Sequence, residues 1–200
     1  RAAPFLDLLA LVEPADSPRV VDLGCGTGEL TRLAHERLGA RETLGIDSSA
    51  AMLERAAAHA GGGLSFRPGD LATFSEGGFD VVLSNAAIHW VPDHEALVPR
   101  LAALVAPGGQ LALQAPANDH HPSHAVARDV AREPAFAGRL GGFVRESPVL
   151  PPEAYARLLH EHLGAADITV NGPGVRPVNE RGVSRLLVGL TYFLLITCLI

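Results

Sequence analysis

The stretch Arg19-Val-Val-Asp-Leu-Gly-Cys-Gly-Thr-Gly-Glu29 decides the fold of this chain. It begins as a short apolar run, passes through three glycines and continues into residues 29–38, where apolar side chains recur at helical spacing. A buried strand that turns through a glycine-rich loop into a helix is typical of open α/β sheets. Such sheets bind ligands at the carboxyl ends of their strands, so this loop marks a candidate site.

Outward from this stretch, strand and helix patterns alternate. Further apolar runs at 43–46, 64–66, 79–83 and 110–114 predict strands, and residues 48–59 and 95–105 have helical patterns between them. This alternation predicts an α/β fold, a Rossmann-like doubly wound, mostly parallel sheet with helices on both faces. We expect four parts, in chain order: an α/β core, a helical substrate-covering insertion after the fifth strand, a sixth strand and an atypical apolar tail. Their bounds are 1–115, 116–163, 164–170 and 171–200.

The spacing of the glycine loop argues against a dinucleotide. The dinucleotide fingerprint needs G-x-G-x-x-G, but its third glycine would fall on Glu29 or Thr31, depending on where the count starts. A carboxylate beside a pyrophosphate is repulsive, so G-x-G-x-G preceded by Asp22 favours a ligand without phosphates. An amino-acid moiety fits, because the amides at the helix start can bind its carboxylate.

Three further strand ends carry polar residues that suit a nucleoside. Asp47, with Ser48 beside it, ends the second strand, where a carboxylate can accept hydrogen bonds from two ribose hydroxyls. Met52 can lie against a flat base. Asp70, followed by Leu71, can accept the exocyclic amine of adenine, although an Asp after Gly is also ordinary turn chemistry. Asn85 ends the fourth strand beneath the expected reacting centre.

These motifs together resemble the class I S-adenosylmethionine-dependent methyltransferase family. The resemblance rests on residues 21–28, on Asp47 and on Gly69-Asp70-Leu71, in that order along the chain. Residues 85–94, 104–124 and 149–155 are also similar to the trans-aconitate 2-methyltransferases of that family. The resemblance implies S-adenosyl-L-methionine as cofactor, held by Asp22, Gly24, Gly26, Gly28, Asp47, Ser48, Met52, Asp70, Leu71 and Asn85. It covers about residues 1–170, so we expect the fold's last antiparallel strand to be absent or replaced.

The resemblance also implies methyl esterification of a small polycarboxylic acid such as trans-aconitate. A carboxylate is already ionised at pH 7, so methyl transfer to it needs positioning and no catalytic base. The expected substrate-binding residues are His89, Trp90, Asn118, His121 and Arg128, the last as one of several insertion arginines suited to carboxylates. The histidines near 120–124 do not have a usual zinc spacing, and we expect no metal.

Composition excludes several classes of function. All 16 basic residues among these 200 are arginine, so lysine Schiff bases and Walker-type phosphate loops are excluded. A net charge of −6 argues against a nucleic-acid partner. Two distant cysteines, Cys25 and Cys198, form neither a metal cluster nor a disulfide framework. We therefore expect a cytoplasmic monomer that acts on a small molecule.

The two ends of the chain leave alternatives open. Arg1 in place of Met suggests a missing N-terminal segment. Residues 186–200 carry no charge, and we consider a cut-off membrane span, a buried strand or helix, and sequence foreign to the fold. Two other functions also remain open: methylation of another small or carrier-bound acceptor, and a truncated copy that binds the cofactor without turnover.

Overall fold

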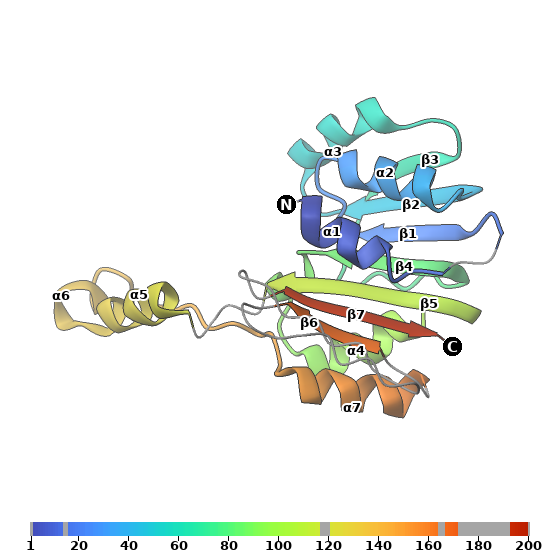
Figure 1. Ribbon diagram of the computed structural model, residues 1–200. Helices are drawn as coiled ribbons and strands as arrows, with labels where there is room; N and C mark the ends of the chain where they lie inside the picture. The colour runs from blue at the N-terminus through green and yellow to red at the C-terminus, as the bar shows by residue number, and fades with distance from the viewer. Residues whose placement is uncertain (1, 14–15, 117–120, 164–166, 172–192, 200) are drawn as a thin grey trace.

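The computed structural model describes residues 2–13, 16–116, 121–163, 167–171 and 193–199. Helices and strands alternate as the sequence pattern predicts from the N-terminal helix to the end of the fifth strand, except that the described residues 69–78, between the third and fourth strands, contain no helix (Figure 1). The elements are α1 (Ala2–Leu9), β1 (Arg19–Leu23), α2 (Glu29–Arg37), β2 (Glu42–Asp47), α3 (Ala50–Ala56), η1 (Ala57–His59), β3 (Leu64–Pro68), β4 (Phe79–Asn85), η2 (Ile88–Trp90), α4 (His94–Ala102), β5 (Val105–Pro116), α5 (Pro122–Arg132), α6 (Pro134–Ala137), α7 (Pro152–Leu163), β6 (Asp167–Asn171) and β7 (Phe193–Leu199).

The strands form one sheet in the order β3-β2-β1-β4-β5-β7-β6. Neighbours among β1 to β5 pair in parallel, which confirms the predicted doubly wound, mostly parallel sheet. The chain reverses the direction of its strand order between β1 and β4, and the carboxyl edge at such a point is where open α/β sheets form a ligand-binding crevice.

One expectation about the sheet is wrong. The last antiparallel strand, expected to be absent or replaced, is present, because β7 runs antiparallel between β5 and β6. Residues 193–199 belong to the uncharged run, so this part of the tail forms a strand, which was one of the alternatives considered. Residues 186–192 and 200 lie outside the described part of the chain.

Two hydrophobic clusters cover the two faces of the sheet. On one face α1 packs Phe5 and Leu8 against residues of β1, β4 and β5 such as Val81. On the other face α4 and α7 pack against alternating residues of the same strands. This arrangement follows from the period-two alternation of strand side chains, which sends Val81 and Val82 to opposite faces.

Helix α7 belongs to the core rather than to the insertion in which the sequence analysis placed it. Its residues Tyr155 and Leu159 are fully buried and pack in the cluster that also contains residues of α4. The segment that leaves the body of the protein is therefore shorter than the predicted insertion and ends before α7.

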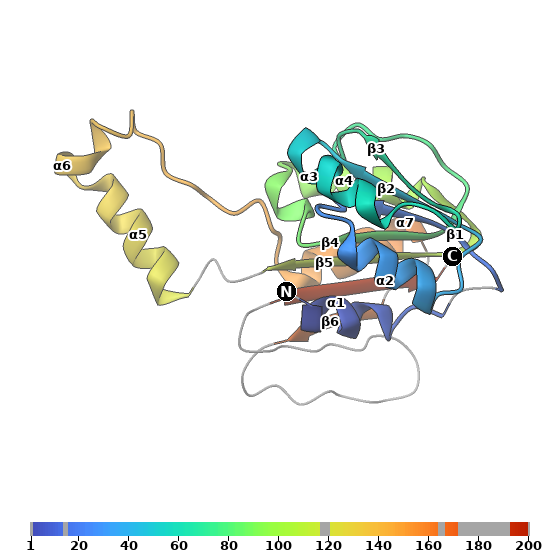
Figure 2. The ribbon, with the colours of Figure 1, turned by 90° about the horizontal axis from the view of Figure 1, so that it is seen from above.

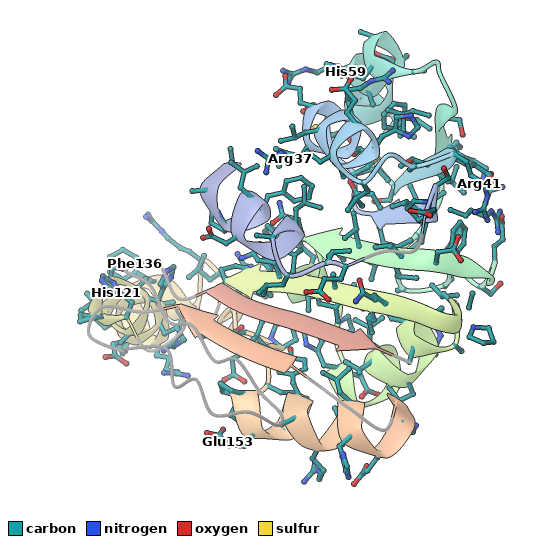
Figure 3. All side chains as sticks on the ribbon, turned by 45° about the vertical axis from the view of Figure 1, so that its right-hand side comes forward. Arg37, Arg41, His59, His121, Phe136 and Glu153 are labelled. Carbon is teal, nitrogen blue, oxygen red and sulfur yellow. The ribbon has the colours of Figure 1, made fainter. Side chains whose placement is uncertain are left out.

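Helices α5 and α6 lie apart from the sheet, beside its carboxyl edge (Figure 2). Figure 3 shows His121 and Phe136 on this projecting hairpin, far from Glu153 on α7. Neither helix has a buried residue, and Val126, Phe136, Leu140 and Phe143 are large apolar side chains left exposed. The insertion thus stands next to the candidate site and does not cover it in this structure.

None of the helices in the described ranges is both long and apolar enough to span a bilayer.

Candidate functional site

The glycine loop is fixed by the end of the neighbouring strand. The amides of Gly24 and Cys25 donate to the carbonyl oxygen of Ile46 at 2.7 and 3.0 Å. Gly24 has a positive φ of 83°, and a Cβ added to it would lie 2.3 Å from the Cβ of Ala87. Only glycine fits there, because the loop after β1 passes directly against the loop after β4. The two loops that border the crevice are therefore in contact.

Asp47 joins the ends of β1 and β2. Its Oδ2 accepts a hydrogen bond from the amide of Gly26 at 2.8 Å, and its Oδ1 accepts from the amide of Ser49 at 2.8 Å. Each carboxylate oxygen has a second lone pair, so the group retains capacity to accept hydrogen bonds from a ligand. The structure brings the predicted loop and the predicted ribose acid together as the sequence analysis expects.

Asp22 anchors the helix that follows the loop. Its carboxylate accepts a 2.6 Å hydrogen bond from the hydroxyl of Thr31 in the first turns of α2. Burial raises the pKa of Asp22 to about 6, the Thr31 hydrogen bond lowers it, and the nearby charge of Asp47 raises it. Asp22 was predicted to lie at the cofactor, whereas its partner Thr31 was not predicted. The signal available in the sequence was a residue with a hydroxyl group in the first turn of the helix that follows the glycine loop.

Ser48 and Met52 lie at the start of α3 with accessible side chains. Ser49, one residue after Ser48, caps the helix by accepting from the amide of Met52 at 3.4 Å. Met52 is 40% exposed, which is high for a long apolar side chain and leaves one of its faces free for a ligand.

The loop after β3 is a turn that its own aspartate stabilises. Asp70 is exposed, and its Oδ1 accepts from the amide of Ala72 at 2.8 Å. Leu71 points into the hydrophobic core and is only 7% exposed. The side chain of Leu71 therefore has a packing role in this structure, and any contact with a ligand would come from its backbone.

The crevice side of β4 and β5 carries polar side chains without partners. Within the described residues, the buried side-chain atoms that lack a hydrogen-bond partner are Asn85 Oδ1, His89 Nδ1 and both amide atoms of Gln114. Asn85 and Gln114 pair across the β4–β5 ladder, so their side chains lie on the same face. Buried polar groups are nearly always satisfied in folded proteins, so the unpartnered amides of Asn85 and Gln114, side by side at the ends of β4 and β5, favour a bound ligand there.

Sequence reasoning did not identify Gln114 as a site residue. The available signal was its position in the apolar run Leu111-Ala-Leu-Gln-Ala115, where a buried strand has no structural need for an amide.

The loop after β4 is held rigidly by a buried network. Tyr155 donates through its hydroxyl to His94 Nδ1, and His94 Nε2 donates to the carbonyl oxygen of Ile88 at 2.9 Å. The carbonyl can only accept, which fixes this tautomer. Burial lowers the pKa of His94, so the imidazole is neutral at pH 7. The same Tyr155 hydroxyl accepts from the amide of Leu150, which ties the end of the insertion to the loop that carries His89 and Trp90.

The predicted substrate residues do not all meet. His89 and Trp90 lie together in η2, with ring centroids 4.9 Å apart. His121 caps α5 and Arg128 lies on the same helix, away from the crevice. Asn118 and His120 lie outside the described residues. In the ranges that the structure describes, no three His, Cys, Asp or Glu side chains gather in a way that would hold a metal ion.

The residues present fit the cofactor that the motifs imply. A Cβ added at Gly26 would meet no atom within 4 Å, so the space above the loop is open beside the Asp47 carboxylate. No nucleophile competes there, because burial and the charges of Asp22 and Asp47 raise the pKa of the Cys25 thiol. The arrangement can hold a cationic nucleoside and position an acceptor, and it offers no covalent chemistry of its own.

Comparison with known proteins agrees with this arrangement. A family model described as a methyltransferase domain matches residues 20–109. The chain is 49% identical to a trans-aconitate 2-methyltransferase of Deinococcus radiodurans, covering 84% of this chain and 66% of the relative, which is just under two thirds of its length. It is 40% identical to the protein of that name from Variovorax paradoxus, covering 90% of this chain and 77% of the relative.

The fold is also shared with solved structures. An S-adenosylmethionine-dependent methyltransferase from Mesorhizobium loti superposes with a TM-score of 0.65 at 21% identity, covering 98% of this chain and 96% of the other.

Proposed function

Since the chain belongs to the trans-aconitate 2-methyltransferase family of S-adenosylmethionine-dependent methyltransferases, we propose that it methyl-esterifies a small polycarboxylic acid of the trans-aconitate type. The observation that carries this proposal is the Asp47 bridge between Gly26 and Ser49, at the open end of β1 and β2. A carboxylate with free lone pairs beside an unobstructed glycine loop suits a ribose and disfavours a phosphate.

The residues of the chain have a positioning role in this reaction. When bound, S-adenosyl-L-methionine supplies a methyl group that passes to a carboxylate oxygen as the sulfur–carbon bond breaks, leaving a thioether. Asp47 and the loop amides orient the donor, and the loop after β4 presents the acceptor. The acceptor is ionised at pH 7, so no proton has to move. Holding two reactants in line contributes roughly 7–11 kcal/mol to lowering such barriers.

This role agrees with the titratable groups near the crevice. Asp22 is hydrogen-bonded to Thr31, and His94 is hydrogen-bonded to Tyr155 and Ile88. None of these groups forms a nucleophile–base pair. That the protein acts as a cytoplasmic monomer remains a prediction from its sequence.

Transfer of a radiolabelled methyl group tests the proposal. The chain is incubated with labelled S-adenosylmethionine and a panel that contains trans-aconitate, other di- and tricarboxylates, monocarboxylates and a carrier protein. We expect a base-labile methyl ester on the polycarboxylates. Transfer only to the carrier protein would contradict the proposed acceptor. Calorimetric binding of the cofactor with no transfer to any acceptor would instead support a binding module.

A matched pair of glycine variants tests where the cofactor lies. Gly26 and Gly39 have φ values of 56° and 58°, and an added Cβ at either meets no atom within 4 Å. We expect Gly26→Ala and Gly39→Ala to lose a similar roughly 1–2 kcal/mol of stability, because both place alanine in the left-handed region. Only Gly26→Ala is expected to weaken cofactor binding, by about 1 kcal/mol, because its methyl group occupies the ligand space. Calorimetry with S-adenosylhomocysteine measures the affinity, and an equal loss in both variants would contradict this placement.

A further inference from the structure

A cationic side chain from the insertion lies over the loop that follows β4. The guanidinium carbon of Arg145 is 4.3 Å from the centroid of the Trp90 ring. Among the described residues Arg145 forms no ion pair, whereas Arg132 of the same insertion pairs with Asp129 and Glu146. In a protein of net charge −6, an arginine without a carboxylate partner at the rim of the crevice has unused capacity to bind an anion.

The position of Arg145 is constrained by the chain that follows it. Four and five residues later the chain returns to the core, where Val149 and Leu150 pack against the hydrophobic cluster. The amide of Leu150 donates to the hydroxyl of Tyr155, which also holds His94. Arg145 is therefore attached to the same network that fixes η2, although α5 and α6 stand apart from the sheet.

Trp90 is held in place for stacking rather than for packing. It is 67% exposed, and its exposed face carries the guanidinium of Arg145. A guanidinium that lies flat on an aromatic ring keeps its edge free, and two parallel N–H groups on that edge match a carboxylate. The Trp90 ring can therefore orient the guanidinium of Arg145 while the N–H groups of that guanidinium remain available to a ligand.

His89 supplies a neutral group beside this cation. Its Nδ1 atom is buried and has no partner. Burial lowers the pKa of His89, and so does the charge of Arg145. A neutral imidazole can donate one hydrogen bond to an anion. Arg145 and His89 therefore complement each other, the first as the charge and the second as a short-range donor.

We propose that Arg145, stacked on Trp90 and adjacent to His89, binds a carboxylate of the acceptor that is not the one methylated. This inference rests on the proposed function and specifies which residues make it selective for polycarboxylates. Binding of the remote carboxylate is the same in the ground state and in the transition state, so its loss raises KM and leaves kcat nearly unchanged. A monocarboxylate has no group for this subsite and is insensitive to it.

Intrinsic fluorescence offers a direct test, because Trp90 is the only tryptophan in the sequence. Trans-aconitate is titrated into the complex with S-adenosylhomocysteine, which cannot turn over, and Trp90 emission is followed. We expect a saturable change in the parent protein and a roughly tenfold weaker affinity in Arg145→Gln, as for the loss of one charged hydrogen-bond pair. Arg145→Lys keeps the charge without the planar fork and is expected to recover only part of the affinity.

Arg100→Gln is the matched control. Arg100 is exposed in the last turn of α4, the helix that leads back to the start of β5, so it lies at the opposite edge of the sheet. This variant makes the same change of charge and is expected to bind trans-aconitate like the parent. S-adenosylhomocysteine affinity is expected to be unchanged in all three variants.

The outcomes separate this inference from the proposed function. If the parent methylates trans-aconitate and Arg145→Gln has the same KM for it, the subsite is elsewhere and only the inference fails. The same conclusion follows if KM for a monocarboxylate rises as much as KM for trans-aconitate. If the parent neither methylates trans-aconitate nor binds it, the proposed function fails as well.

Discussion

Replacing Asp47 with alanine is expected to lower the affinity for S-adenosylmethionine by about 1.5–3 kcal/mol, roughly 10- to 150-fold. The loss has two sources. The ribose hydroxyls lose a charged acceptor, and the amides of Gly26 and Ser49 lose the carboxylate that holds the two loops together. Asp47→Asn keeps one acceptor oxygen but not the charge, so an intermediate affinity is expected. Calorimetry with S-adenosylhomocysteine measures all of these affinities without turnover.

Asp80→Ala is a control for the structural part of this loss. The carboxylate of Asp80 also accepts from a backbone amide of β1, that of Arg19 at 2.7 Å, and it forms an ion pair with Arg41. It lies near the start of β4, at the edge of the sheet opposite the crevice. Its removal is expected to destabilise the fold without changing cofactor affinity. Unchanged affinity in Asp47→Ala, or an equal loss in Asp80→Ala, would overturn the assignment of the ribose acid.

Replacing Gln114 with leucine is expected to stabilise the protein and impair its activity at the same time. Gln114 is fully buried and neither of its amide atoms has a partner, so burying it costs free energy. An apolar side chain of similar size removes that cost, and we expect the free energy of unfolding to rise by about 1–3 kcal/mol. If the amide binds a ligand, kcat/KM for the acceptor falls by roughly tenfold. Urea titration and steady-state kinetics on the same variant measure both quantities.

Gln110 provides a control on the same strand and the same face. It is also buried, but its Oε1 accepts a 2.8 Å hydrogen bond from the amide of Glu13. Gln110→Leu leaves that amide without a partner, and we expect lower stability with unchanged kcat/KM. If Gln114→Leu raises the free energy of unfolding and Gln110→Leu lowers it, Gln114 has no structural role that explains its polar side chain, and a role in ligand binding is supported. If Gln114→Leu is as active as the parent, the amide has no role toward a ligand.

The cofactor half of the site was predictable from the sequence because each of its parts is a short local motif. Each element lies within a few residues of a strand end, and parallel strands bring their carboxyl ends to one edge whatever the rest of the chain does. The contact of Gly26 with Asp47 follows from two local motifs and a sheet order. The roles of Asp70 and Leu71 were less certain, because an exposed turn and a core leucine satisfy the same pattern.

The acceptor half was not predictable in the same way. Several arginines of the insertion have similar local sequences, and helical periodicity does not say where a projecting hairpin will lie. Only the packing of Val149 and Leu150 into the core places Arg145 on Trp90, while Arg128 remains on α5. That the amide of Gln114 is buried without a partner could not be predicted from the sequence either, because its burial depends on the strands and helices around β5.

By itself, the sequence determined the parallel sheet, the glycine loop and the acid that faces it, because periodicity and strand-end motifs act over a few residues. Tertiary structure alone decided that α7 is core, that residues 193–199 form an antiparallel strand between β5 and β6, and that Arg145 lies over the Trp90 ring. The physical reason is that each of these outcomes depends on contacts with segments far away in the chain, which local patterns do not encode.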